Sequence, residues 1–402
     1  MAPMMGRRPL EKTGLISRAI TQGRYLCRMT IAVNTRFLLG EYLEGYGHFI
    51  FEAFSRIASD HPDHRFLFLF DRPVAPGFRF SENVTPLVVG PAARHPLLWK
   101  FWYDVRVPAL LRKHRADVFV SPDGMASLRT AVPQVLVLHD LAFLHYPGFL
   151  PRSQTFFYKR YTPRFLANVR MVATVSEFSR RDILNHYSVP PDRVRVVYSG
   201  FKDVFRPLGL EEKAAVRSQY TEGRAFFLCT GALHPRKNLV QLLRAFSLFK
   251  KRQQSSFKLV LAGRMAWKNA AFNTLLSTYK YRDDVVLTGY LPDGELARLT
   301  ASAYALVYPS LFEGFGVPVL EAFRCEVPVI TGSGTAMQEI AGDAALFAAP
   351  TDPEALADQM MRLYTDESLC RRLGLAGRER SASFTWDRTA ALLWDTITAA
   401  MR

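Results

Sequence analysis

Short apolar runs alternate with amphipathic segments along almost the whole chain. The runs have the length of buried strands. The segments between them repeat apolar residues at helical spacing, as Phe49, Ala53, Phe54 and Ile57 do within residues 46–59. This alternation is typical of parallel sheets covered by helices on both faces. The sequence therefore predicts an α/β protein built on parallel sheets.

The predicted strands fall into two sets, separated by a segment rich in glycine and proline, residues 199–209. A chain of 402 residues is also too long for one ordinary core. We therefore predict two Rossmann-like domains, residues 29–200 and 201–384, that face each other across a ligand-binding cleft. A C-terminal helix, residues 385–402, is expected to pack across the domain boundary. The predicted strands are 30–33, 66–70, 84–89, 118–121, 135–138, 171–175 and 195–198 in the first set, and 226–230, 258–262, 285–287, 305–308, 327–330 and 345–347 in the second.

The chain is basic, with a net charge of +16, and the excess lies mainly in its first half. Such a bias fits an anionic partner, such as phosphates or an acidic membrane surface. It fits equally well a net charge that only keeps the protein soluble. Nucleic acid is disfavoured, because the sequence contains no zinc finger, RNP aromatic motif or dense Arg/Lys tract. Residues 94–115 mix basic and aromatic side chains, which fits either peripheral contact with an anionic membrane or a helix packed on the sheet.

The four cysteines are widely spaced, which argues against a disulfide framework or a zinc site and suits a reducing cytosol. No apolar run reaches the ~18 residues needed to span a bilayer. Residues 1–28 lack the apolar core of a signal peptide and are interpreted as a disordered basic tail, or as a start site assigned too early. We therefore expect a cytoplasmic protein, at the inner face of the membrane if it touches one.

Residues 313–321 read EGFGVPVLE, which places Glu313 and Glu321 on either side of a glycine turn that opens a helix. Carboxylates accept hydrogen bonds from the hydroxyls of a sugar, whereas free amides at a helix N-terminus suit phosphates. The alternative is a surface acid beside a second acid that favours the helix dipole. That alternative does not explain the two glycines and the proline between the acids. The motif therefore predicts a nucleotide-sugar site.

A basic pair, Arg236 and Lys237, follows the predicted strand 226–230 and precedes a helix for which Asn238 is a plausible cap. Two cations beside a helix N-terminus form a clamp for a diphosphate, because Arg binds two oxygens and Lys supplies a point charge. A basic pair in this position is more often a solvated surface. Its place one strand after the domain linker, together with the spaced glutamates, favours the clamp.

The chain resembles the retaining glycosyltransferases of family 4, which share the GT-B fold. The likeness covers nearly everything from Met29 onward, and its second-half motifs are specific in combination. These are GALHPRKN (231–238), LTGYL (287–291), SLFEGFGVPVLEA (310–322) and PVITGSGTAMQEIAGDAALF (328–347). The first half agrees more loosely, through EGYG (44–47), HDL (139–141), ATVSEFSRRDI (173–183) and VVYSG (196–200).

The resemblance implies which residues bind the donor. The diphosphate would be held by Arg236 and Lys237, the ribose by Glu321, the sugar by Glu313, Gly314, Phe315 and Gly316, and the base would lie near Tyr290 and Leu291. Gly231 is a further candidate for binding the donor. One departure concerns the clamp. Many members of the family carry an Arg directly after the strand-end glycine, where this chain has Ala232, and Arg236 is the candidate for that second charge.

Five candidates on the acceptor side come from the first half. Gly45 and Gly47 stand between the first strand and its helix, where they allow a ligand to approach the backbone or simply form a turn. His139 and Asp140 end one strand and Asp123 follows another, so all three are expected to point into the cleft. A lone histidine at a strand end is, on the other hand, often structural.

No metal site is predicted, because Asp283 and Asp284 are interpreted as acids of a turn and no other group has metal-ligand spacing. The resemblance also implies transfer without a metal. Lys237, Glu313 and His139 would then be the catalytic residues, and the cationic clamp would stabilise the departing diphosphate.

The sequence thus predicts a retaining glycosyltransferase that moves a hexose from a nucleoside diphosphate sugar to a hydroxyl acceptor, with no bound cofactor. Likeness to bacterial mannosyltransferases favours GDP-mannose as donor and a glycan or lipid-linked acceptor in the synthesis of a surface polysaccharide or glycolipid. Three alternatives stay open: a nucleotide-sugar isomerase or hydrolase on the same fold, a non-catalytic nucleotide-sugar binding module, and a nucleic-acid binder. The residues alone do not determine the base, the sugar, the acceptor or the oligomeric state.

Overall fold

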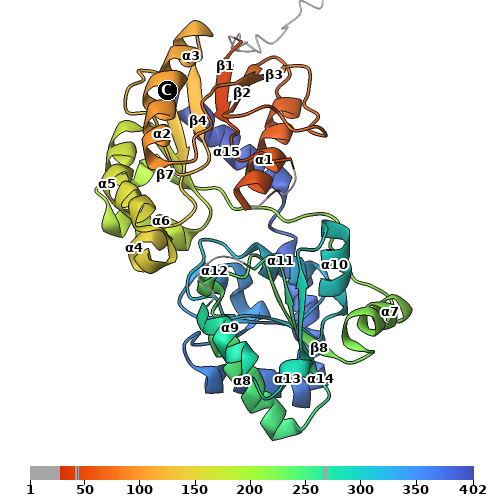
Figure 1. Cartoon of the computed structure of the whole chain (residues 1–402). Helices are drawn as coiled ribbons and strands as arrows, with labels where there is room; N and C mark the ends of the chain where they lie inside the picture. The colour runs from red at the N-terminus through yellow and green to blue at the C-terminus, as the bar shows by residue number, and fades with distance from the viewer. Residues whose placement is uncertain (1–27, 41–42, 44, 266–269) are drawn as a thin grey trace, which may run out of the picture.

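The computed structural model describes residues 28–40, 43, 45–265 and 270–402. They form two α/β domains joined by a linker, with the first domain above the second in Figure 1. Three features of the sequence fall outside the described residues. These are the predicted basic tail up to Cys27, Glu44 of the EGYG motif and residues 41–42 just before it.

The first domain is built on a seven-stranded sheet in the order β3-β2-β1-β4-β5-β6-β7, and every neighbouring pair of strands is parallel. The apolar runs expected in this half form its strands, with small shifts at their ends, so these predictions are confirmed. The strands are β1 (Thr30–Asn34), β2 (Arg65–Phe70), β3 (Val84–Val88), β4 (Val118–Ser121), β5 (Gln134–Val137), β6 (Met171–Thr174) and β7 (Val194–Val196).

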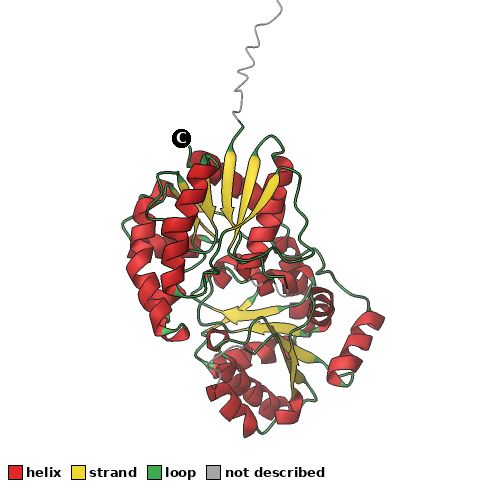
Figure 2. Ribbon diagram, turned by 45° about the horizontal axis from the view of Figure 1, so that its top comes forward, coloured by secondary structure: helices red, strands yellow, loops and turns green. Residues whose placement is uncertain are grey.

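Helices cover both faces of this sheet (Figure 2). The first of them, α1 (Gly45–Asp60), buries the apolar stripe that its sequence predicted, including Phe49, Ala53 and Phe54. The other helices are α2 (Pro96–Phe101), a π-helical turn (Trp102–Arg106), α3 (Val107–Lys113), α4 (Ala142–His145), α5 (Arg152–Asn168) and α6 (Glu177–His186).

Residues 94–115, for which the sequence left two interpretations, contain α2, the π-helical turn and α3. The rings of Trp99, Trp102 and Tyr103 are buried, whereas Phe101 is exposed. Most of the aromatic side of this segment therefore packs against the sheet. Among the helices that the structure describes, none combines the length and the apolarity that a crossing of a bilayer requires.

The second domain contains a six-stranded sheet in the order β10-β9-β8-β11-β12-β13, again parallel throughout. The six predicted strands are confirmed. They are β8 (Phe226–Thr230), β9 (Lys258–Ala262), β10 (Val285–Gly289), β11 (Ala305–Tyr308), β12 (Val329–Gly332) and β13 (Leu346–Ala348). The helices are α7 (Leu210–Thr221), α8 (Leu239–Gln253), α9 (Ala270–Ser277), α10 (Asp293–Ser302), α11 (Val317–Arg324), α12 (Ala336–Ala341), α13 (Pro353–Thr365), α14 (Glu367–Ser381) and α15 (Trp386–Ala399).

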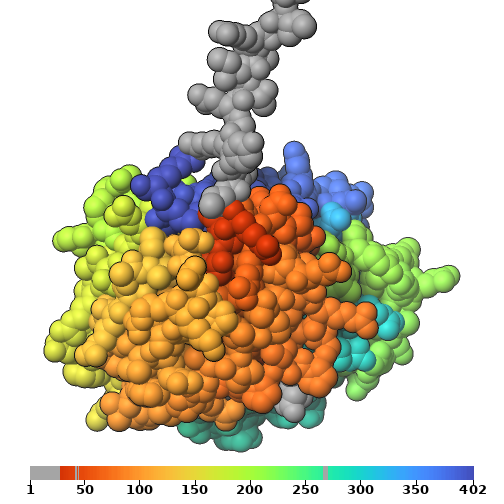
Figure 3. Space-filling view, turned by 90° about the horizontal axis from the view of Figure 1, so that it is seen from above, coloured from red at the N-terminus to blue at the C-terminus, as the bar shows by residue number. Residues whose placement is uncertain are grey.

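The last helix returns the chain to the first domain. α15 lies against α1 and β6, and the Thr389 hydroxyl donates a hydrogen bond to the Tyr198 carbonyl at 2.7 Å. The path is tight, because a Cβ on Gly200 would lie 2.6 Å from the backbone nitrogen of Trp386. In Figure 3 the C-terminal end of the chain (dark blue) accordingly lies beside red, orange and yellow-green atoms of the first domain.

In each sheet the strand order reverses next to the first strand of the domain. The reversal lies between β1 and β4 in the first sheet and between β8 and β11 in the second. Open parallel sheets bind ligands at such a switch point, beyond the carboxyl ends of the strands. In the second domain the chain leaves the sheet there at Thr230 and at Tyr308. The loops that follow these two residues carry the basic pair and the EGFG motif, so topology brings the two predicted motifs to one place.

Candidate active site

Two loops at the carboxyl edge of the second sheet lie side by side. After β8 the chain forms a 3-10 turn, Pro235–Lys237, and after β11 it runs through Leu311 to α11. The Leu311 amide donates a hydrogen bond to the Arg236 carbonyl at 2.9 Å. This backbone contact holds the basic pair beside Glu313.

The cluster built on these loops centres on the carboxylate of Glu313. Its Oε1 accepts a hydrogen bond from Lys237 Nζ at 2.8 Å, and its Oε2 lies 3.1 Å from Arg236 Nη1. The Tyr308 hydroxyl contacts both Lys237 Nζ and Glu313 Oε1, and the Lys237 ammonium lies 4.1 Å from the centre of the Tyr308 ring. Sequence analysis missed Tyr308, although its place as the last residue of a buried strand before the EGFG loop was a usable signal.

Burial and the ion pairs together determine the protonation states of the side chains in this cluster. Burial acts to raise the pKa of Glu313, but Arg236 and Lys237 outweigh it and hold that pKa below its usual value. Glu313 is therefore ionised at neutral pH. Burial lowers the pKa of Lys237, and the carboxylate of Glu313 opposes that shift. The two cations therefore supply positive charge where a diphosphate is expected to bind, and Glu313 balances part of it.

The N-terminus of α8 stands directly behind Lys237. Asn238 occupies the cap position as predicted, but its side chain makes no capping hydrogen bond, so that part of the prediction was wrong. The left-handed backbone of Asn238, with φ of 60°, turns the side chain away from the helix, and its amide donates to the carbonyl of Pro309 at 3.3 Å. The positive end of the helix therefore adds to the charge of the basic pair.

Glu321 lies on α11, just beyond the glycine turn. Its side chain is buried, with 6% of the residue exposed. Burial raises the pKa of Glu321 to about 7, while Lys202 and Lys237 oppose the shift and Asp293 adds to it. The charge of Lys237 thus acts on the carboxylate of Glu321. Lys202 and Asp293, which form an ion pair at 2.6 Å, were missed because the linker and α10 carry no motif that singles them out.

A cavity of about 280 Å³ opens beside this region, between the two domains. Its lining includes His48 and Glu52 of α1, Lys202 of the linker and Asp293 of α10. Burial lowers the pKa of His48 to about 4, with Lys202 acting in the same direction. The cavity therefore combines a neutral imidazole with charged groups from both domains.

The first domain contacts the EGFG loop directly. A Cβ on Gly314 would collide with the carbonyl oxygen of His139 and lie 2.9 Å from the Cβ of Asp140. The Ser176 hydroxyl donates to the Gly314 carbonyl at 2.7 Å, and Arg236 Nη1 lies 3.6 Å from Asp140 Oδ2. The structure thus brings the predicted residues His139 and Asp140 against the donor-side cluster.

A second contact between the domains involves Glu339 of α12. Its carboxylate accepts hydrogen bonds from the amides of Glu177 and Phe178 at 2.8 and 2.7 Å, at the N-terminus of α6. It also accepts one from the Tyr198 hydroxyl at 3.0 Å. Glu339 lies within the sequence motif of residues 328–347, but no pattern in the sequence predicted this role for it.

His139 is held in one orientation. Its Nε2 lies 3.1 Å from the carbonyl oxygen of Pro122, and its ring packs edge-on against Tyr46 and Phe49. Burial lowers the pKa of His139 to about 4, so the ring is neutral at pH 7. Because a carbonyl only accepts hydrogen bonds, Nε2 carries the proton and Nδ1 is left as an acceptor.

Asp123 does not reach the domain interface, contrary to prediction. Its side chain is fully buried and accepts hydrogen bonds from Arg36 Nε at 2.5 Å and from the Tyr103 hydroxyl at 2.7 Å. Arg36 follows β1 and Asp123 follows β4, so the switch point of the first sheet brings them together. The carboxylate neutralises a buried guanidinium there and offers no surface to an acceptor.

The glycine pair of the first domain is also placed differently. Gly45 and Gly47 belong to the first turn of α1 rather than to a loop before it. Gly47 is buried, and a Cβ there would lie 2.7 Å from the carbonyl oxygen of Phe37. Its small size is therefore needed for packing of the helix on the loop after β1, and not for access of a ligand.

The remaining predicted donor residues occupy two regions of the same edge. Gly231, with φ of 104°, directly follows β8, and a Cβ there would lie 3.7 Å from Lys237 Nζ. Phe315 is buried, and Gly316 has φ of 105° at the start of α11. Tyr290 and Leu291 follow β10, the edge strand of this sheet, and Tyr290 is 50% exposed.

Two family models match the chain. The model of glycosyl transferases group 1 matches residues 211–380, which lie in the second domain. The model of glycosyltransferase family 4 matches residues 58–203, which lie in the first domain. Together the two matches cover most of both domains.

The chain is also similar to bacterial mannosyltransferases. It is 28% identical over 300 residues to O-antigen chain mannosyltransferase B of Escherichia coli, covering 73% of this chain and 78% of that protein. It is 25% identical over 401 residues to the serotype-specific mannosyltransferase WbdA of Escherichia coli, covering 98% of this chain and 46% of WbdA. The chain thus spans about half the length of WbdA.

Solved structures share the fold. WaaG, a glycosyltransferase involved in lipopolysaccharide biosynthesis, has a TM-score of 0.71 at 18% identity, covering 92% of this chain and 99% of that one. HepE of Anabaena, solved in complex with UDP and glucose, has a TM-score of 0.71 at 15% identity, covering 92% of this chain and 100% of that one. The two family matches show that the chain belongs to the family 4 glycosyltransferases, and the solved structures show that it has the GT-B fold.

Proposed function

We propose that this protein transfers a hexose, mannose in our preferred assignment, from a nucleoside diphosphate sugar to a hydroxyl acceptor with retention of anomeric configuration. The observation that carries the proposal is the convergence of Lys237, Arg236 and Glu313 at the switch point of the second sheet, against His139 and Asp140 of the first. The cations proposed to bind the diphosphate and the carboxylate proposed to bind the sugar then lie against the domain proposed to bind the acceptor.

The donor would bind along the edge of the second sheet. The diphosphate suits Lys237, Arg236 and the N-terminus of α8, since all three present positive charge. Glu321 suits the ribose, because a buried carboxylate becomes a strong acceptor once it is ionised, and the charges of Lys202 and Lys237 favour the ionised form. The bound UDP and glucose of HepE, a protein of the same fold, support a donor of this class.

In the proposed reaction the bond between the anomeric carbon and the diphosphate oxygen breaks, and its electron pair leaves with the diphosphate. Lys237 and Arg236 stabilise that negative charge, an effect worth about 3–4 kcal/mol per well-placed donor. The acceptor hydroxyl attacks from the same face of the sugar, and its proton passes to an oxygen of the departing diphosphate. Because the protein cations take the charge, no metal ion or other cofactor enters the step.

Glu313 and His139 would position the sugar. Glu313 is ionised and therefore accepts hydrogen bonds from sugar hydroxyls, while it keeps both cations in place. His139 is neutral, with Nε2 bound to the Pro122 carbonyl, which leaves Nδ1 to accept from a hydroxyl. Both residues orient groups by accepting hydrogen bonds, so neither needs to transfer a proton.

The mannosyltransferase relatives support mannose as the sugar and a polysaccharide or lipid-linked glycan as the acceptor. We place the reaction in the cytoplasm, where nucleotide-sugars are made, with a basic first domain suited to peripheral contact with an anionic membrane. Nucleic acid is not among the proposed partners.

The experiment is a transfer assay with purified protein, GDP-mannose and a panel of glycan and lipid-linked acceptors, in buffer with and without EDTA. We expect a new glycoside with the α configuration of the donor, as measured by the coupling constants of its anomeric proton and carbon in NMR spectra. The rate of its formation should be the same with and without EDTA. An inverted product overturns the retaining assignment. Free mannose or an isomerised nucleotide-sugar as the main product, with every acceptor, establishes the hydrolase or isomerase alternative instead.

A further inference from the structure

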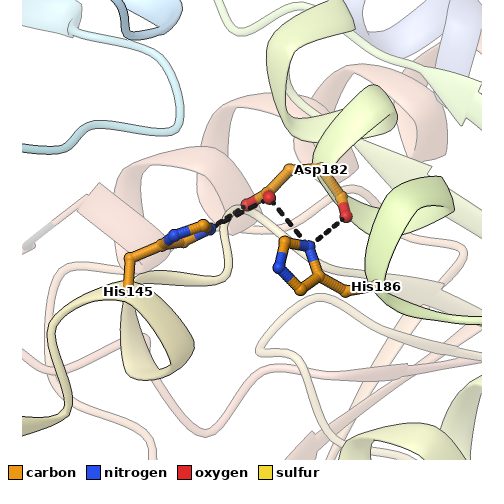
Figure 4. A group of neighbouring side chains, drawn as sticks. All are labelled: His145, Asp182 and His186. Atoms are coloured by element: carbon orange, nitrogen blue, oxygen red, sulfur yellow. Dashed lines mark hydrogen bonds and ion pairs between the residues drawn. The ribbon is translucent and has the colours of Figure 1, made fainter.

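A group of three side chains that could ligate a metal lies in the first domain, where one of them, His145, stacks on Phe312 of the loop that carries Glu313. Asp182 and His186 are one helical turn apart on α6, so both point to the same side of that helix. His145 is the last residue of α4. Figure 4 shows both imidazoles turned toward the carboxylate of Asp182.

The ligand atoms of this group are close together. His145 Nε2 lies 2.9 Å from Asp182 Oδ2, and His186 Nδ1 lies 3.1 Å from Asp182 Oδ1. One ligand atom from each residue can be chosen so that all three lie within 4.8 Å of one another. The side chains of His145 and His186 are 33% and 41% exposed, whereas that of Asp182 is only 10% exposed. An ion from solution can therefore reach the histidines, with the carboxylate beneath them.

We propose that His145, Asp182 and His186 bind one divalent transition-metal ion of the Zn²⁺ type. Two imidazoles and a carboxylate are a ligand set that suits zinc, with a water molecule as the fourth ligand. Bonds of about 2.1 Å at tetrahedral angles place ligand atoms about 3.4 Å apart, so closing this group needs an inward movement of about 1 Å. Both histidines are partly exposed, and their side chains can make that movement without repacking the core.

The surroundings favour a defined site over a chance group of surface residues. The N-terminus of α6 is fixed by the Ser176 hydroxyl, which accepts from the Ser179 amide at 3.1 Å. The His145 ring is stacked on Phe312 at 4.8 Å between centres, which limits its rotation. The competing arrangement is a hydrogen-bonded cluster without metal, in which His186 Nδ1 bonds the Asp182 carbonyl oxygen at 2.9 Å. That bond would have to break when the ion binds.

All three ligands belong to the first domain, and none of them takes part in the proposed sugar transfer. The inference therefore does not depend on the proposed function. The spacing of residues in the sequence did not single out this group, because His145 is far from the other two in sequence and only the fold brings it to α6.

The test uses the full chain without an affinity tag, treated with a chelator and free of nucleotide. The protein is titrated first with Zn²⁺, followed by calorimetry, and then with Co²⁺, followed by visible absorption. We expect one ion per chain and the intense d–d bands of four-coordinate Co²⁺. The single variants His145→Ala and His186→Ala should each weaken Zn²⁺ binding at least tenfold. Far-UV circular dichroism and cooperative thermal unfolding in the presence of chelator establish that both variants are folded.

A matched control comes from a second pair of neighbouring histidines. His61 and His64 stack on Trp394, with ring centres 3.7 and 5.3 Å from the indole. The double variant His61→Ala/His64→Ala should bind Zn²⁺ as the wild type does. The proposal is overturned if the wild type binds no ion, or if the control variant loses binding while His145→Ala and His186→Ala keep it.

Discussion

Gly314 of the second domain lies so close to the backbone of His139 in the first domain that a side chain at position 314 would collide with the His139 carbonyl oxygen. This contact is where the EGFG loop meets the strand-end motif of the first sheet. We expect Gly314→Ala to hold the domains apart and to reduce kcat/KM for transfer by tenfold or more, because the acceptor side would be displaced from the donor. Steady-state kinetics measure the loss.

The matched control is Gly209→Ala in the linker, where a Cβ would meet only Glu212 Oε2 at 3.9 Å and the backbone φ is −68°. That variant should keep wild-type kinetics. Small-angle scattering of the Gly314→Ala variant should show a larger radius of gyration than the wild type. Full activity with an unchanged radius would show that the close contact has no role in turnover.

Lys237→Ala tests the diphosphate clamp. Lys237 is buried beside Glu313 and Tyr308, and its ammonium is expected to stabilise the leaving diphosphate. We predict that kcat/KM falls by about 10²–10³-fold, the usual effect of removing one donor from a transition-state site. The melting temperature should change little in comparison, because Arg236 still pairs with Glu313.

The control for the clamp is Lys251→Ala at the exposed C-terminal end of α8, which removes the same charge from the same helix. It should leave turnover unchanged. A Lys237→Ala enzyme with normal turnover would count against any role of this ammonium in catalysis.

Glu321 makes stability depend on pH. The pKa of Glu321 is about 7 in the folded protein and 4.5 in an unperturbed glutamate. Between these values the folded state holds the proton more tightly than the unfolded chain does. The stability that this proton provides is therefore full below pH 4.5 and is lost as the pH rises to 7, a loss of about 3 kcal/mol.

We predict that Glu321→Gln, which stays neutral, melts several degrees above the wild type at pH 8 and close to it at pH 4.5. Differential scanning fluorimetry across this range measures the difference, and Glu367→Gln at an exposed position is the control. The same substitution should weaken binding of the nucleotide-sugar at pH 8. Equal melting temperatures at pH 8 would show that the pKa of Glu321 is not raised in the folded protein.

Asp123→Asn tests whether Asp123 supports the fold or the reaction. The substitution leaves the buried guanidinium of Arg36 without its counter-charge, which costs about 3–5 kcal/mol and lowers the melting temperature by about 10 °C. We expect turnover per folded molecule at 15 °C to stay near that of the wild type. A second variant, Arg36→Met/Asp123→Leu, should recover part of the lost stability because it removes both charges. A variant with normal stability and no turnover would restore Asp123 to the acceptor site.

The sequence predicted the elements well because strands and helices follow from local patterns. Every expected strand formed, since each is a short apolar run that can only be buried in a two-faced sheet. The motif that contains Glu313 and Glu321 was also visible in the sequence, and the structure places Glu313 beside the predicted basic pair. Its role in binding the donor stays a prediction. The predicted roles of Asp123 and Gly47 were wrong. A position at a strand end, or in a Gly-x-Gly pair, does not determine which groups from the rest of the chain pack against the residue.

Local sequence thus determined the two parallel sheets, the linker and the residues that open the helices near the donor site. Tertiary structure alone decided which distant residues meet. The order of the strands places Lys237 beside Glu313 and Tyr308, Arg36 beside Asp123, and His145 beside α6. The physical reason is that apolar burial depends on the spacing of residues within a segment, whereas ion pairs and ligand sites depend on which loops the sheet order brings to one edge.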